Sequence, residues 1–98
     1  MKEHTFTDNG SFDTGIAAAS GNQWHTLAYD GDLGGGTLQV FGRAGGGAAA
    51  VPIPDSKLAA GRTDGNGDTV KVFRFVPFGE IRVTLSGATS PDVTIWIE

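Results

Sequence analysis

The fold is decided by the stretch GEIRVTLSGATSPDVTIWIE, which covers residues 79–98. Apolar and polar residues alternate with a period of two in both halves, and the turn formers Gly87–Pro91 separate the halves. This pattern predicts a β-hairpin with a loop longer than two residues. With the loop centred on Thr89, six aliphatic side chains share one face, in the pairs Leu85–Val93, Val83–Ile95 and Ile81–Ile97. A slip of one residue would turn three of them to the other face, so the register is strongly specified.

The opposite face of this predicted hairpin carries polar and aromatic residues. It sets Thr84 beside Thr94 and Arg82 beside Trp96, and a guanidinium next to an indole predicts a cation–π pair. Three interpretations of Trp96 stay open at this point. It covers Arg82 and its neighbours, it anchors another chain as tryptophans at interface hot spots do, or it offers an aromatic platform to a sugar.

Short apolar runs with glycine-rich connections continue upstream of the hairpin. Sixteen glycines and the absence of alternating strands and long helices predict an all-β protein, a small antiparallel β-sandwich or jelly-roll-like barrel of six to eight short strands. Residues 1–98 are predicted to form one domain, in which residues 1–8 have a second interpretation as an extended N-terminal arm. The other strands are expected at residues 2–7, 12–16, 23–29, 37–43, 51–54 and 68–76.

Three of these strands carry further expectations. The strand Phe12–Ile16 either stands alone or continues the first strand after a bulge at Gly15. The strand Gln23–Tyr29 has an aromatic residue on each face, so either face could be the buried one. The run DTVKVFRFV, residues 68–76, has valines on one face and phenylalanines on the other, and we expect both faces to be covered in part.

The connections between the strands are also predicted from their residue types. Asp30–Asp32 is typical of a turn that the following glycines extend, and Gly45–Ala50 is typical of a loop of low complexity. Prolines in Val51–Pro54 restrict this segment to an edge strand or an extended loop, because proline donates no ladder hydrogen bond. One helical turn is expected at Ser56–Ala60.

Composition excludes several classes of function. The formal net charge is −4 and the seven Lys and Arg residues are scattered, so binding to nucleic acid is not expected. There is no cysteine, which rules out disulfides and thiolate metal sites. The N-terminal residues MKEHTFTDNG contain no apolar signal-peptide core, and no run approaches the roughly 20 apolar residues of a membrane span. We therefore expect synthesis in the cytoplasm, with no association with a membrane.

No set of residues in the sequence predicts catalysis, a cofactor or a firm metal site. The segment Asp64–Asp68 begins like a calcium loop, but an EF-hand would need glycine at Thr69 and glutamate at Phe75. A polar turn is the expected structure, with a looser calcium site at Asp64, Asn66 and Asp68 as the second interpretation. The imidazoles of His4 and His25 have no nucleophile elbow near them in the sequence. The chain is therefore expected not to be an enzyme.

The C-terminal run resembles the ending of small virion proteins of tailed bacteriophages. In those proteins a segment R-V-x-L-S-G-A-T-S-P precedes a final strand, and here it matches residues 82, 83, 85 and 86–91. The segment GDLGGGTLQV, which comes after a tryptophan-containing strand, is similar in kind to their glycine-turn region. The resemblance covers about the last third of the chain well and the centre loosely, and it carries over no catalytic residue.

The resemblance implies a structural protein of the virion, most specifically a capsid cement or decoration protein on the capsid surface. Its partner would be the major capsid protein, and a homo-oligomer, with a trimer favoured, would be expected from shell symmetry. A carbohydrate- or receptor-binding module of a tail or fibre is the alternative. The candidate partner-binding residues are Lys2, His4, Phe6, Trp24, Phe78, Arg82 and Trp96.

Overall fold

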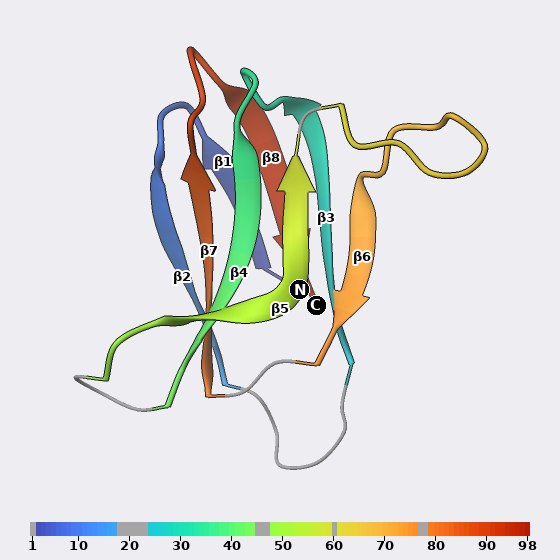
Figure 1. Cartoon of the computed structure of the whole chain (residues 1–98). Helices are drawn as coiled ribbons and strands as arrows, with labels where there is room; N and C mark the ends of the chain where they lie inside the picture. Colours follow the sequence, from blue (N-terminus) through green and yellow to red (C-terminus); the bar gives the residue numbers. More distant parts are fainter. Residues whose placement is uncertain (1, 18–23, 45–47, 60, 77–78) are drawn as a thin grey trace.

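The computed structural model describes residues 2–17, 24–44, 48–59, 61–76 and 79–98, with the side chains of Ala17 and Asp55 left out. It confirms the predicted all-β class, since the described residues form eight strands in two antiparallel four-stranded sheets packed as a sandwich (Figure 1). One sheet has the order β1-β8-β3-β6 and the other β2-β7-β4-β5. The strands are β1 (Lys2–Phe6), β2 (Gly10–Ala17), β3 (His25–Asp32), β4 (Thr37–Arg43), β5 (Val51–Ala59), β6 (Val72–Phe75), β7 (Glu80–Ser86) and β8 (Asp92–Ile97).

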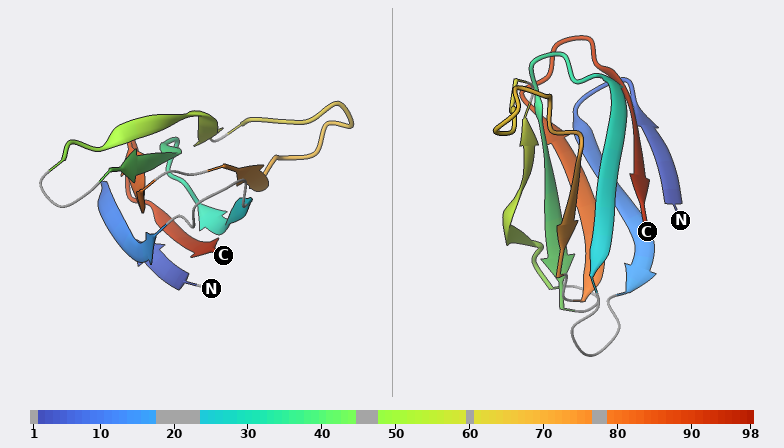
Figure 2. Two further views of the ribbon diagram at one scale, coloured as in Figure 1. Left: turned by 90° about the horizontal axis from the view of Figure 1, so that it is seen from below. Right: turned by 90° about the vertical axis from the view of Figure 1, so that its right-hand side faces the viewer.

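The first four strands pair with the last four in reverse order, as in one long hairpin that is folded over into two sheets. Strand β1 pairs with β8, β2 with β7, β3 with β6 and β4 with β5, all antiparallel. Two further pairings, β3 with β8 and β4 with β7, join these four pairs into the two sheets. This arrangement of eight strands is a jelly roll. Figure 2 shows the two layers from the side and from below.

The core lies between the two sheets and contains the six aliphatic residues of the C-terminal stretch. Ile81, Val83 and Leu85 of β7 and Val93, Ile95 and Ile97 of β8 are each at most 1% exposed. Their predicted burial is therefore confirmed. In the other strands the same alternation of apolar and polar residues places Leu27, Leu38 and Leu58 in this core.

The predicted hairpin between these two runs is wrong. Strand β7 belongs to one sheet and β8 to the other, so the two face each other across the core instead of pairing. Gly87, with φ of 70°, and Ser90, with φ of 48°, lie in the connection that carries the chain between the layers. The alternation of apolar and polar residues specifies which side chains are buried. It is equally compatible with two strands that pair in one sheet and with two strands that face each other from different sheets.

The neighbours predicted for the outer residues are wrong for the same reason. Arg82 lies beside Asp13 of β2 in one sheet. Trp96 lies beside Glu3 of β1 in the other sheet. Thr94 likewise pairs with Thr5 instead of Thr84. The predicted cation–π contact between Arg82 and Trp96 is therefore absent.

Strand β1 forms one edge of its sheet. Lys2–Phe6 pairs along its whole length with β8. Of the two interpretations of the N-terminal segment, these residues therefore adopt the strand and do not extend as an arm. Phe6 is 4% exposed and belongs to the core, so its side chain presents little surface to a partner.

Strand β2 contains the predicted irregularity at Gly15. Its pairing register with β7 shifts between Asp13 and Ala17, and Gly15 has φ of 72°. Thr14 is buried beside the shift, and its hydroxyl donates to the carbonyl oxygen of Ile81 at 2.8 Å. The Thr14 hydroxyl oxygen also accepts the amide of Ile16 at 3.0 Å, so one side chain satisfies two backbone groups that the bulge removes from the ladder.

Strand β5 is the edge strand that its prolines predict, but it is longer than expected. Residues 56–59 continue the strand, so the helical turn predicted there is wrong. The buried Ser56 hydroxyl lies 2.6 Å from the carbonyl oxygen of Ile53 and 3.0 Å from that of Val40. These contacts hold the middle of β5 against β4, where the register between the two strands shifts.

The connection between β3 and β4 begins later than predicted. Asp30, Gly31 and Asp32 belong to β3, and the turn is formed around Gly34 and Gly35. Of the predicted loop Gly45–Ala50, residues 45–47 lie outside the described residues, and residues 48–50 have no regular structure.

Strand β6 is shorter than the predicted strand over residues 68–76, and it is an edge strand. On its inner face Phe75 is buried, but Val72 is 54% exposed and Val76, just after the strand, is 42% exposed. The expectation that both faces are partly covered is therefore wrong for Val72 and Val76, whereas Val70 of the same face packs partly buried against the core.

Candidate functional site

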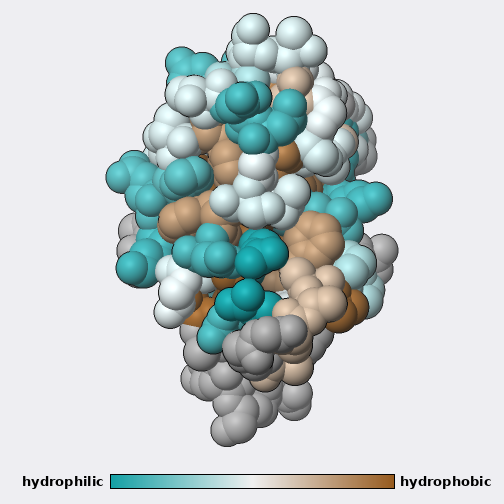
Figure 3. All heavy atoms as spheres, turned by 90° about the vertical axis from the view of Figure 1, so that its left-hand side faces the viewer, coloured by the Kyte–Doolittle hydropathy of each residue, from teal (hydrophilic) through white to brown (hydrophobic). Residues whose placement is uncertain are grey.

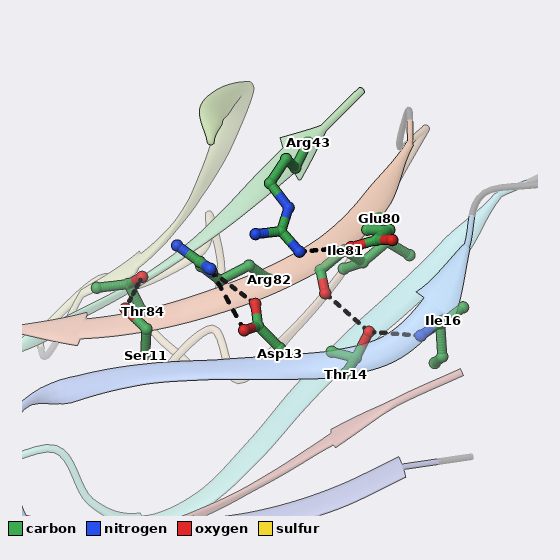
Figure 4. A network of polar contacts seen from close by, with 9 residues as sticks. All are labelled: Ser11, Asp13, Thr14, Ile16, Arg43, Glu80, Ile81, Arg82 and Thr84. Carbon is green, nitrogen blue, oxygen red and sulfur yellow. Dashed lines mark hydrogen bonds and ion pairs between the residues drawn. The ribbon is translucent and has the colours of Figure 1, made fainter. Parts of the chain in front are cut away.

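The two sheets differ in the side chains that they turn outward. On the outer face of the β2-β7-β4-β5 sheet, Arg82 bonds to Asp13 with N–O distances of 2.6 and 3.3 Å, and Arg43 lies 2.6 Å from Glu80. Figure 4 shows these ion pairs along β2, β7 and β4, together with the hydroxyl contact of Ser11. The charged groups of Asp13, Arg43, Glu80 and Arg82 on this face are thus paired within the chain.

The ion pair with Arg82 changes the titration of Asp13. Hydrogen bonding by the Arg82 guanidinium, opposed by desolvation and helped by the charges of Arg82 and Arg43, holds the pKa of Asp13 below its usual 3.8. The hydrogen bond that Arg82 donates to Asp13 in turn raises the pKa of Arg82. Arg82, predicted to bind a partner, is thus engaged within its own chain.

The outer face of the β1-β8-β3-β6 sheet is different, and we call it the apolar face. Thr26 of β3 lies between Arg74 of β6 and Glu98, to which it is joined by two backbone hydrogen bonds. One row further along, Ala28 lies between Val72 and Trp96. The apolar face is formed by Trp24, Thr26, Ala28, Val72, Arg74, Val76, Trp96 and Glu98.

Three of the four most exposed large apolar side chains of the described residues lie on the apolar face. Trp24 is 62% exposed, and Val72 and Val76 are each more than two-fifths exposed. The guanidinium of Arg74 lies over the Trp24 ring, 5.6 Å from its centroid. The molecule thus has a cation–π pair, although not the predicted one. Contiguous exposed apolar groups of this kind are typical of contact surfaces.

One shallow hollow lies on the apolar face, and a second lies at its β6 edge, next to β5 of the other sheet. The first, of about 400 Å³, is lined by Thr26, Ala28, Trp96 and Glu98. The indole nitrogen of Trp96 donates to Glu3 at 3.0 Å, which directs the ring toward β1. The other hollow, of about 390 Å³, is lined by Trp24, Ile53, Pro54, Arg74, Phe75 and Val76.

The remaining predicted partner residues lie apart from the apolar face. Lys2 is exposed in β1, and Phe78 lies outside the described residues. The ring of His4 stacks on Phe12 of β2, with centroids 4.2 Å apart. On the side where β1 and β2 lie, apolar atoms show between hydrophilic ones (Figure 3). His4 therefore helps to close the gap between the two sheet edges.

His25, the other candidate imidazole, packs against the core. Its ring centroid is 6.2 Å from that of Phe75, and Nδ1 is buried without a hydrogen-bond partner among the described residues. No described carboxylate lies within ion-pair distance of either histidine. The described part of the chain thus presents no orienting acid for a His25-centred hydrolase.

The Asp64–Asp68 segment has the geometry of the predicted polar turn. One carboxylate oxygen of Asp64 accepts the amides of Asn66 and Asp68 at 2.8 and 3.1 Å. Thr63 and Thr69 form an isolated bridge that closes the turn. Among the described residues no three His, Cys, Asp or Glu side chains gather as metal ligands would.

No protein family, curated protein or solved structure matches this chain. In the described residues no helix has the length and apolar character needed to cross a membrane.

Sequence reasoning placed Trp24 and Trp96 among the partner-binding candidates, and the two lie on one face of one sheet. It missed the exposure of Val72 and Val76. The signal was present in the strand itself, because alternation puts Arg74 on the same face as these valines. A charged residue in the centre of a valine row indicates that the row faces water.

Proposed function

We propose that this chain is a non-enzymatic structural protein of a virion, specifically a capsid cement protein that binds the assembled shell of major capsid protein. The observation that carries the proposal is the apolar face, with Trp24, Val72 and Val76 exposed, which is typical of a chain that works in an assembly with other copies or other proteins. A surface of this kind suits protein contact, and tryptophan and arginine are frequent in binding hot spots.

The fold and the sequence ending support the same class. Jelly rolls occur in viral capsid domains and in lectins, which is an analogy at the level of fold. The resemblance of residues 82–91 to phage virion proteins points to the first of these. A protein that binds only the assembled shell would stabilise it by mass action, without any reaction centre.

Analysis of purified particles by mass spectrometry tests the virion role. We expect the chain in hundreds of copies per particle, and its removal should lower the temperature at which the shell disrupts. Finding it in the lysate but not in particles would refute the proposal.

A carbohydrate- or receptor-binding module of a tail or fibre is the second candidate. The hollow beside Trp96 favours it, since an aromatic ring flanked by Glu98 and Thr26 can stack on a sugar and hydrogen bond to its hydroxyls. Glycan binding should change tryptophan fluorescence, and the change should disappear in Trp96→Ala. A flat response across a broad glycan array would exclude this candidate.

A further inference from the structure

We propose that the apolar face is covered by a second copy of this chain, related to the first by a two-fold axis close to the direction of β3. The proposal concerns the assembly of the chain itself and goes beyond the virion role: with the apolar face covered by a second copy, the dimer would meet the shell through its other surfaces. The evidence for this dimer is the arrangement of charged, large apolar and small side chains from β6 across β3 to β8.

Two rows of residues cross the face at right angles to the strands. The first runs Arg74, Thr26, Glu98 from β6 through β3 to the end of β8, and the second runs Val72, Ala28, Trp96. In both rows β3 supplies the smallest side chain. On either side of β3, the first row carries the cation Arg74 and the anion Glu98, and the second row carries the apolar side chains of Val72 and Trp96.

A two-fold axis along β3 makes these rows complementary to themselves. Rotation about it places β6 of one copy over β8 of the other, since the two strands lie on opposite sides of β3. Arg74 of each copy then faces Glu98 of the other, and Val72 of each faces Trp96. The small residues Thr26 and Ala28 meet at the axis, while the Trp24 ring, just before β3, lies against Arg74 on the β6 side. The two sheets can then approach to the ~10 Å of face-to-face packing.

The charges of the face favour a second copy over an unrelated partner. The arginines on the outer face of the other sheet, Arg43 and Arg82, pair with carboxylates of their own chain. Arg74 has no carboxylate within 4.0 Å among the described residues. A partner surface that is only acidic would attract Arg74 but repel Glu98, and one that is only basic would do the reverse. A copy turned by the two-fold axis matches both and forms two ion pairs.

Charge reversal tests this arrangement directly. The variant Arg74→Glu sets the introduced carboxylate against Glu98 in both halves of a dimer, and Glu98→Arg sets two guanidinium groups against each other. Because like charges in contact across an interface are strongly unfavourable, each variant should raise the dimer Kd at least about tenfold in sedimentation equilibrium. The matched control, Lys57→Glu on the other sheet, should leave it unchanged.

Mixing the two single variants gives the decisive result. In a heterodimer of Arg74→Glu with Glu98→Arg, one contact pairs the two introduced charges and becomes attractive, and the other restores the original pair of Arg74 with Glu98. The mixture should therefore dimerise although neither variant does alone. Native mass spectrometry distinguishes the heterodimer by mass, and circular dichroism checks that each variant is folded. A chain that stays monomeric, forms a trimer, or dimerises equally with like charges would overturn the proposal, whatever the outcome of the virion test.

Discussion

Asp13 and Arg82 illustrate how a single ion pair couples stability to pH. The pKa of Asp13 is lower in the folded chain than the usual 3.8, so the unfolded chain holds more protons around that pH. The stability from this pair is therefore present above pH 3.8 and is lost as the pH falls through the lower folded value. The contribution is modest, because the Asp13 side chain is 63% exposed and solvent screens the pair.

Asp13→Asn should accordingly flatten the fall in Tm at acid pH. Thermal melts between about pH 5 and pH 2 measure it, in the window that the lowered pKa of Asp13 defines. Arg82→Gln should flatten the curve to a smaller extent, because the charge of Arg43 still lowers the pKa of Asp13, and the double variant should add nothing to Asp13→Asn alone. A double variant whose effect equals the sum of the two would contradict the assigned pairing.

Thr14 is the residue on which the bulge in β2 depends. Thr14→Val keeps the shape of the side chain but leaves the amide of Ile16 and the carbonyl of Ile81 without their partner. Unsatisfied groups in a buried site cost about 1–3 kcal/mol, which urea unfolding can measure. Ser11→Ala removes an exposed hydroxyl contact on the same strand and should cost less than about 0.5 kcal/mol. Equal costs for both variants would rule out this role for Thr14.

At the scale of elements, alternation in the sequence predicted burial well and strand partners poorly. The limits of β4 at Thr37 and Arg43 and the buried faces of β7 and β8 depend on residues within each strand. Membership of a sheet depends on contacts between distant segments, such as Lys2 with Ile97, which no local pattern contains. The apolar face was therefore predicted only in part, because it combines three strands whose order the sequence does not state.

The turn between β3 and β4 packs against the connection between β7 and β8. Substitutions at its two adjacent glycines, Gly34 and Gly35, can distinguish the cost of backbone strain from the cost of losing this contact. Both Gly34 and Gly35 have positive φ, at 61° and 77°. A Cβ on Gly34 would collide with the backbone of Thr89, whereas one on Gly35 would meet nothing within 4 Å.

Gly35→Ala should cost about 1 kcal/mol from backbone strain alone. Gly34→Ala should cost more than about 3 kcal/mol, because the two connections must also move apart. Chemical denaturation of both variants measures the difference. Similar costs would mean that the contact between the connections contributes little to stability.

At the scale of the whole molecule, the first and last strands lie side by side. Lys2 pairs with Ile97, and Figure 2 shows the two ends of the chain close together. Every other strand pair is nested inside this one, so the jelly roll is closed by residues almost the full length of the chain apart. A short glycine–serine linker could therefore join the ends without disturbing either sheet.

A circular permutant with joined ends and new termini at Gly65–Asn66 should fold with a free energy of unfolding within about 2 kcal/mol of the original, because this turn is exposed and makes mainly local contacts. New termini between Gly87 and Ala88 should be far more damaging. Ala88 exchanges two hydrogen bonds with the Asn9 side chain, and the Thr89 amide donates to Gly34 at 2.9 Å. Urea unfolding of both permutants compares the two cuts in molecules of identical composition. If the second permutant were as stable as the first, the crossing between the sheets would not be what holds the two layers in place.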